Sequence, residues 1–158
     1  MKLIRYGIMA LALTLAVPAF AQTPATSTDM QILLAKVKAD KKLVVSRNME
    51  LTEAEAATFW PIYDAYQHDL QGINDRLRAT IGGYVDAYNK GLVDNATAKK
   101  LLHEFLAIEK AESKLPQTYV PKLEKVLPET KVARYIQIEN KIRAVVHYEL
   151  AARIPLIE

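Results

Sequence analysis

Six apolar residues in the middle of the chain follow one another at intervals of four, three, four, three and four residues. They are Phe59, Tyr63, Tyr66, Leu70, Ile73 and Leu77. This spacing places all six side chains on one face of an α-helix, and that face has to pack against other helices to leave water. β-Strands alternate with a period of two residues, and no segment of the sequence shows that alternation. The sequence therefore predicts an all-α fold.

The start of this long helix is marked by the segment Leu51-Thr52-Glu53-Ala54-Glu55. The Thr52 side chain can accept a hydrogen bond from the backbone N–H of Glu55, and the Glu55 carboxylate can accept one from the N–H of Thr52. Leu51 stands at the apolar position just before the cap. We assign Leu51, Thr52 and Glu55 to helix capping, with no catalytic role, and Gly91 to the end of the same helix.

A first helix is expected to precede this one, from Asp29 to about Arg47, with Leu43 and Val44 among its apolar positions. Its lysines are expected to pair with the acidic second helix; binding to anionic lipid headgroups is the alternative. Within the second helix, Pro61 removes one backbone hydrogen bond, which predicts a bend in the early turns.

Two more helices are expected, one starting at Asp94 or Asn95 and one opened by Pro128. Pro116 and Pro121 lie within the third pattern and either bend the helix or break it. The expected core positions of these two helices are Leu101, Phe105, Ile108, Leu115, Tyr119, Val126, Val132, Tyr135 or Ile136, Ile138, Ile142, Val145 and Val146. The predicted architecture is an elongated four-helix bundle whose second and third helices form a bent antiparallel hairpin.

The N-terminus has the layout of a secretory signal peptide. Lys2 and Arg5 are followed by the apolar stretch Ile8–Val17, then Pro18 and the small-residue pattern Ala-Phe-Ala. The apolar stretch is too short to span a bilayer of about 30 Å. We therefore predict export to the periplasm with cleavage, and no membrane span afterwards.

Taken together, these patterns predict a signal peptide at 1–21, a disordered polar leader at 22–28 and a single α-helical domain at 29–158. The sequence has no cysteine, which excludes disulfides, thiolate metal sites and thiol catalysis. Without Lys2 and Arg5, the 21 basic residues become 19 against 18 acidic ones, a net charge of about +1. So small a charge does not favour a nucleic-acid partner.

The residues that could carry chemistry are scattered. There is no nucleophile elbow, no glycine-rich phosphate loop and no HExxH motif. His68, His103 and His147 lie on three different predicted helices, and no two have the spacing of paired ligands on one helical face. We predict no enzymatic activity, no cofactor and no metal site; a metal-binding or metal-resistance protein is the alternative.

The aromatic residues suggest a binding surface. Trp60, Tyr63 and Tyr66 surround Pro61, where a bent helix would present a concave side. Aromatic side chains supply large contact area at low entropic cost, which suits the binding of unfolded client proteins. The alternative is that these rings fill the core of the bundle.

The Leu-Thr-x-x-Glu motif of residues 51–55 resembles the LTxxQ motif of the periplasmic family that includes Spy and CpxP. A second copy falls at Leu127-Pro128-Glu129-Thr130-Lys131, with Pro in place of Thr and Lys in place of Gln. The resemblance covers residues 30–150. It implies a bent helical hairpin that dimerises into a cradle and acts as an ATP-independent chaperone or envelope-stress adaptor. The expected partners are unfolded clients or a sensor domain, and a homodimer.

Overall fold

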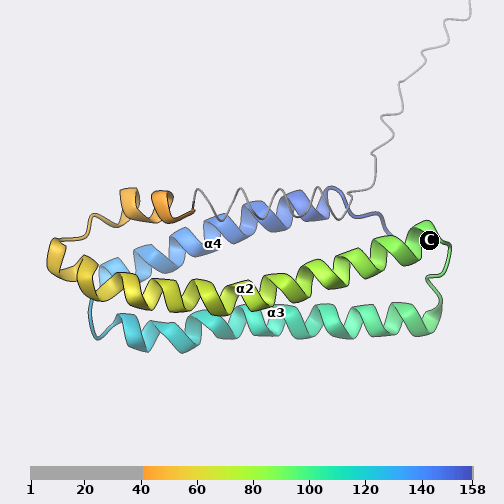
Figure 1. Ribbon diagram of the computed structural model, residues 1–158, viewed down its shortest axis with the longest axis horizontal. Coiled ribbons are helices and arrows are strands. Elements are labelled where there is room, and N and C mark those ends of the chain that lie inside the picture. Colours follow the sequence, from red (N-terminus) through yellow and green to blue (C-terminus); the bar gives the residue numbers. More distant parts are fainter. Residues whose placement is uncertain (1–40, 158) are drawn as a thin grey trace, which may run out of the picture.

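The computed structural model describes residues 41–157, which form helices joined by short connections (Figure 1). Residues 41–49 are helical and lead into α2 (Glu53–Asn89), α3 (Asn95–Leu123) and α4 (Glu129–Ala151). No strand occurs within 41–157, and the predicted all-α helical bundle is confirmed. The predicted signal peptide, the leader and the beginning of the first helix lie outside the described residues.

The helix ends follow the capping chemistry expected from the sequence. The Thr52 hydroxyl accepts from the Glu55 N–H at 3.3 Å, and the Glu55 carboxylate accepts from the Thr52 N–H at 2.8 Å. Asp94 caps α3 by accepting from the N–H of Thr97 at 2.8 Å. Gly91 follows α2 with a φ of +64°, the left-handed conformation that glycine adopts without steric cost. The capping-box prediction is confirmed.

The helices continue through their prolines. Pro61 lies inside α2, and Pro116 and Pro121 lie inside α3. A proline removes one hydrogen bond from the helix, but packing of an apolar face can compensate for it. Leu115 and Tyr119, next to the prolines of α3, are buried in the core. Of the two outcomes expected for α3, a break is therefore wrong.

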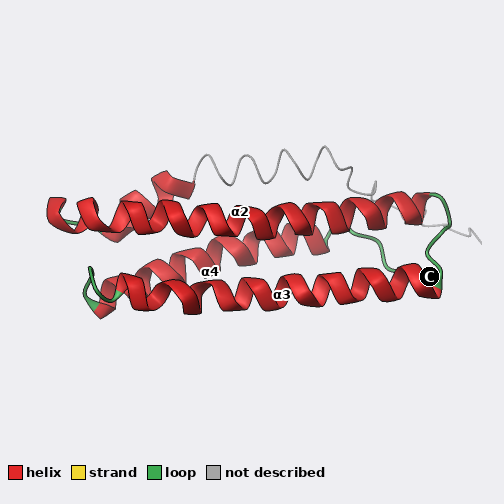
Figure 2. Cartoon of the chain, turned by 60° about the horizontal axis from the view of Figure 1, so that its bottom comes forward, coloured by secondary structure: helices red, strands yellow, loops and turns green. Residues whose placement is uncertain are grey.

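The three long helices lie side by side with alternating direction (Figures 1 and 2). Residues 90–94 connect α2 to α3, and residues 124–128 connect α3 to α4. Backbones approach within 8 Å between α2 and α3 and between α3 and α4, but nowhere between α2 and α4. Side chains therefore have to fill the space between α2 and α4.

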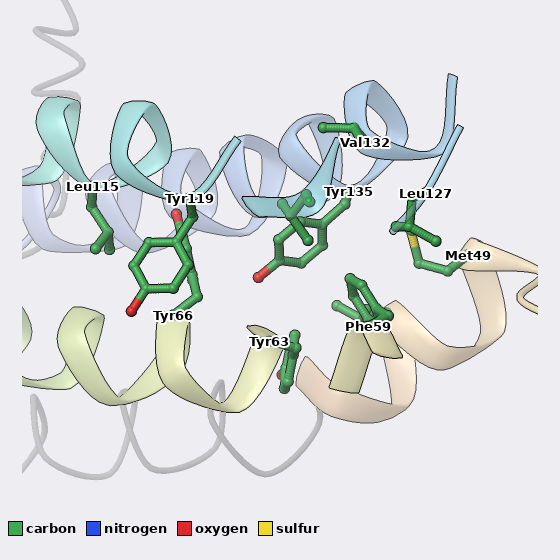
Figure 3. Close-up of a cluster of buried hydrophobic side chains, with 11 residues drawn as sticks. Met49, Phe59, Tyr63, Tyr66, Leu115, Tyr119, Leu127, Val132 and Tyr135 are labelled. Atoms are coloured by element: carbon green, nitrogen blue, oxygen red, sulfur yellow. The ribbon is translucent and has the colours of Figure 1, made fainter. Parts of the chain in front are cut away.

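Aromatic rings occupy much of that space (Figure 3). Phe59 and Tyr135 meet edge to face with centroids 5.2 Å apart, as do Tyr66 and Tyr119. Such arrangements add to the stabilisation from burial itself. The buried residues of this cluster are Val45, Met49, Phe59, Tyr63, Tyr66, Leu115, Tyr119, Leu123, Leu127, Val132 and Tyr135. A second cluster contains Leu77, Ile108, Val146 and Leu150.

Several expected core positions are exposed instead. Phe105 and Val145 face solvent on α3 and α4, and Leu43 and Val44 face solvent on the helical segment 41–49. That segment continues past Arg47 to residue 49 and buries the Val45 and Met49 side chains. The intervals between apolar residues allowed either face of this helix to be buried, because both Val44 and Val45 fit a helical stripe.

Candidate functional site: a groove between α2 and α4

A cavity of about 620 Å³ lies between α2 and α4. Its apolar surface includes Leu70 and Leu77 from α2 and Ile142 and Val146 from α4. We call this cavity the α2/α4 groove. It exists because the two backbones stay more than 8 Å apart, so side chains meet across the gap without filling it along its whole length.

A buried ion pair stands at one end of the groove. The Lys41 ammonium lies 2.7 Å from the Glu139 carboxylate, and their side chains are only 8% and 4% exposed. Gln67 donates to the same carboxylate at 2.9 Å and to the Tyr135 hydroxyl at 3.3 Å. Because a buried charge is costly without a partner, these contacts fix the segment 41–49 against α4 and α2.

The sequence reasoning missed this network, although a signal was present. Glu139 follows Tyr135 by four residues and precedes Val146 by seven, so it occupies a core position of α4. Lys41 likewise precedes the buried Val45 by four residues. Two opposite charges at core positions of different helices indicate a buried pair.

Further along the groove, the walls carry both signs of charge. Glu112, which is buried, contacts His147 at 3.2 Å. Arg78 pairs with Asp75 at 2.8 Å, while Arg143 donates to the Asn140 amide oxygen at 2.6 Å. The groove is thus apolar at its floor and mixed in charge at its walls. Such a surface complements an amphipathic segment better than it does a ligand of one sign.

The aromatic residues predicted to bind clients occupy two different settings. Tyr63 and Tyr66 border the groove but are only 4% and 2% exposed, so the expectation that they lie on an open surface is wrong. Burial raises the pKa of both phenols, and the Glu139 charge raises it further. Trp60 is half-buried, packs edge to face on Phe59 at 5.0 Å and lies 5.1 Å from the Lys42 ammonium. Lys42 also lines the α2/α4 groove, so Trp60 lies beside the end of that groove.

The two motif copies meet in the structure. Lys131, the last residue of the second copy, donates to the Glu55 carboxylate at 2.6 Å and to the Glu50 carbonyl at 2.9 Å. The Lys131 hydrogen bond, together with the Thr52 backbone N–H, lowers the pKa of Glu55 to about 2. Glu50 has a φ of +48°, a rare conformation for a side-chain-bearing residue, and its carbonyl is held by Lys131. Glu55 thus caps α2 and also ties it to α4.

The histidines occupy separate environments. His68 and His103 are exposed, and His147 contacts Glu112. Within residues 41–157, no three histidine, aspartate or glutamate side chains gather as a metal-binding group would require. None of the helices in this range has the length and apolar character needed to cross a membrane.

The site is therefore defined by the α2/α4 groove, its ion pair and the neighbouring Trp60. Comparisons of the chain with protein-family models, with curated proteins and with solved structures found no match.

Proposed function

We propose that this chain is a non-enzymatic helical binding protein of the periplasm, an ATP-independent chaperone or stress adaptor that holds apolar segments of incompletely folded proteins. The observation that carries the proposal is the α2/α4 groove, with its apolar floor between charged walls. The N-terminal signal-peptide pattern supports the location, and the resemblance to the LTxxQ-motif proteins supports the class of function.

The dimensions of the groove suit part of a client helix or strand. Its volume of about 620 Å³ lies within the range of sites that bury a ligand of several apolar groups. Leu70 and Leu77 are seven residues apart, which is about 10 Å along α2, or two helical turns. A client could therefore place two or three apolar side chains against the floor.

The charged walls favour broad selectivity. Lys42 and Arg78 each lie beside an acidic partner, Asp64 at 3.0 Å and Asp75 at 2.8 Å. Exposed pairs of this kind are weak, and either member can turn to a charge on the client. Binding would then depend on apolar contact, with little demand on the client's charge, as a chaperone requires.

The test is protection of an aggregating client, thermally denatured citrate synthase, measured by light scattering. Ile142→Glu puts a charge into the apolar floor and should abolish protection. Val145→Glu, on the same helix but exposed and outside the groove, is the matched control and should keep it. Asn74→Trp narrows the groove without adding a charge and should also reduce protection.

Melting temperatures of the variants separate binding from stability. Loss of protection by Ile142→Glu and Asn74→Trp with a folded protein supports the groove as the binding site. Equal protection by the wild type and both groove variants would rule out the groove, and no protection by the wild type would rule out the chaperone function.

A further inference from the structure

The end of the segment 41–49 lies beside the first half of α4, where the Arg134 guanidinium donates to the Asn48 carbonyl at 3.4 Å (Figure 1). Between these two helical stretches is a second cavity, of about 280 Å³. None of its lining residues belongs to the α2/α4 groove. Six of its seven lining residues are polar or charged, and only Ile138 is apolar. A ligand for this cavity has to be polar, because an apolar one would desolvate these groups without replacing their hydrogen bonds to water.

Positive charge dominates this cavity, which we call the basic pocket. Arg47, Arg134 and Lys141 line it, and the only carboxylate among its lining residues is that of Glu50. Three cations and one carboxylate give a net charge of about +2. Within residues 41–157, neither Arg47 nor Lys141 takes part in an ion pair. The pocket therefore carries positive charge that no described side chain neutralises.

The one ion pair in the basic pocket is weak. The Arg134 guanidinium lies 3.5 Å from the Glu50 carboxylate, and their side chains are 48% and 77% exposed. Water screens an exposed pair at this distance, so it contributes little and an incoming anion can replace the carboxylate.

The helices hold the cations around one place. Arg134 and Lys141 are seven residues apart on α4, two turns or about 10 Å along the same face, with Gln137 between them. Arginine and lysine side chains are long, so both can reach a ligand that lies over Gln137. Arg47 approaches from the segment 41–49. Asn48, on the same segment, donates to the Val44 carbonyl at 2.7 Å, which helps to fix the wall of the pocket before any ligand binds.

We propose that the basic pocket binds a small, water-soluble phosphate monoester. Such a group carries a charge of about −1.5 to −2 at pH 7, which matches the net charge of the pocket better than the single charge of a carboxylate does. The planar guanidinium groups of Arg47 and Arg134 are suited to paired hydrogen bonds with phosphate oxygens, and Lys141 adds a point charge. This site is independent of the α2/α4 groove and goes beyond the proposed chaperone function.

The size of the pocket indicates that the phosphate is attached to a small polar group. A phosphate group has five heavy atoms, which at about 30 Å³ each, the volume of a water molecule, fill about half of the 280 Å³. The remaining space suits a single sugar ring. The Gln137 amide can bond to ring hydroxyls, and Ile138 can contact the apolar face of the ring.

Isothermal titration calorimetry with glucose 1-phosphate tests the proposal, and glucose without the phosphate should not bind. Binding of glucose 1-phosphate should weaken from pH 7.5 to pH 5, because the second pKa of a phosphate monoester is about 6 and the ligand loses one of its charges. No histidine is among the lining residues of the basic pocket, so this change comes from the ligand.

Charge-neutral variants locate the site. Lys141→Gln and Arg47→Gln each remove one exposed cation and should weaken binding about tenfold. Lys110→Gln is the matched control, because it removes the same charge from an exposed position on α3 and should leave binding unchanged. Glu50→Gln should strengthen binding about threefold, because it frees Arg134 from its competing carboxylate. A purely structural role of these residues would not produce this gain.

Three outcomes overturn the proposal. The first is a wild type that does not bind glucose 1-phosphate, and the second is an equal loss of affinity in Lys110→Gln and Lys141→Gln. The third is binding to phosphatidylcholine vesicles that contain phosphatidic acid, without binding to glucose 1-phosphate, because the phosphate would then belong to a lipid headgroup. Lys141→Gln should protect an aggregating client as well as the wild type does, so the pocket and the groove can succeed or fail separately.

Discussion

Replacing Lys41 by methionine should destabilise the protein far more than the loss of one surface lysine would. The Lys41 and Glu139 charges are 2.7 Å apart, which corresponds to an attraction of about 6 kcal/mol at an effective dielectric constant of about 20. Desolvation of both ions offsets most of this gain while the pair is intact. In Lys41→Met the Glu139 carboxylate stays buried with only the uncharged donors Gln67 and Tyr135, so we expect a loss of about 3–5 kcal/mol.

The double variant Lys41→Met/Glu139→Leu removes both charges and should be more stable than Lys41→Met alone. A residual loss of about 1 kcal/mol is expected because Gln67 gives up one hydrogen bond. Lys42→Met is the matched control. Its ion pair with Asp64 is exposed, and its contact with Trp60 is a cation–π interaction, so its loss should cost about 1 kcal/mol or less.

Urea denaturation followed by circular dichroism measures these differences in unfolding free energy. The comparison requires that the slope of the unfolding free energy against urea concentration is the same for all the variants. A loss below about 1 kcal/mol for Lys41→Met would refute the view that the pair is effectively buried. A double variant as unstable as Lys41→Met would show that the methionine itself fits badly, and that the unpaired carboxylate is not the cause.

Three further predictions concern the other polar contacts. Thr52→Ala should lower the unfolding free energy by about 1 kcal/mol, measured by urea denaturation, because it removes the α2 cap. The pKa of Glu55 is lowered to about 2 in the folded state, from an ordinary 4.5, so its contribution to stability is present above pH 4.5 and is lost as the pH falls towards 2. Because Lys131→Met removes the hydrogen bond that lowers this pKa most, the melting temperature of this variant should fall less than that of the wild type when the pH is lowered from 4.5 to 2. Burial, and then the hydrogen bond to Asp69, raise the pKa of Tyr119 to about 12. In an absorbance titration this phenol should therefore ionise about two pH units above a free tyrosine, and its ionisation step should be missing in Tyr119→Phe.

Local chemistry made the helix boundaries predictable. A cap depends on residues within one turn, so Thr52 with Glu55, and Asp94 before α3, could be recognised without knowing the fold. The seam of α2 was predictable because its spacing is regular over five intervals, and Phe59 and Leu77 at its two ends are both buried.

The candidate site depended on contacts distant in sequence, and these were mostly missed. The periodicity of α4 admitted Val145 to the core as readily as it placed Glu139 there. A carboxylate is stable at a core position only if a cation from another helix reaches it, and the pattern of α4 alone does not show that contact. Phe105 matched a core position of α3 but lies where no described helix covers it. Whether such a residue is buried or exposed depends on which helices pack against its own helix.

The order of connections along the chain has a kinetic consequence. The five-residue links 90–94 and 124–128 let α2, α3 and α4 pair through contacts close in sequence, which favours rapid folding. Lys41 and Glu139 are 98 positions apart, so the segment 41–49 can form its ion pair only after α4 is in place. Contacts made late in folding affect the unfolding rate more than the folding rate. Weakening this attachment should therefore shorten the lifetime of the folded state while leaving the speed of its formation almost unchanged.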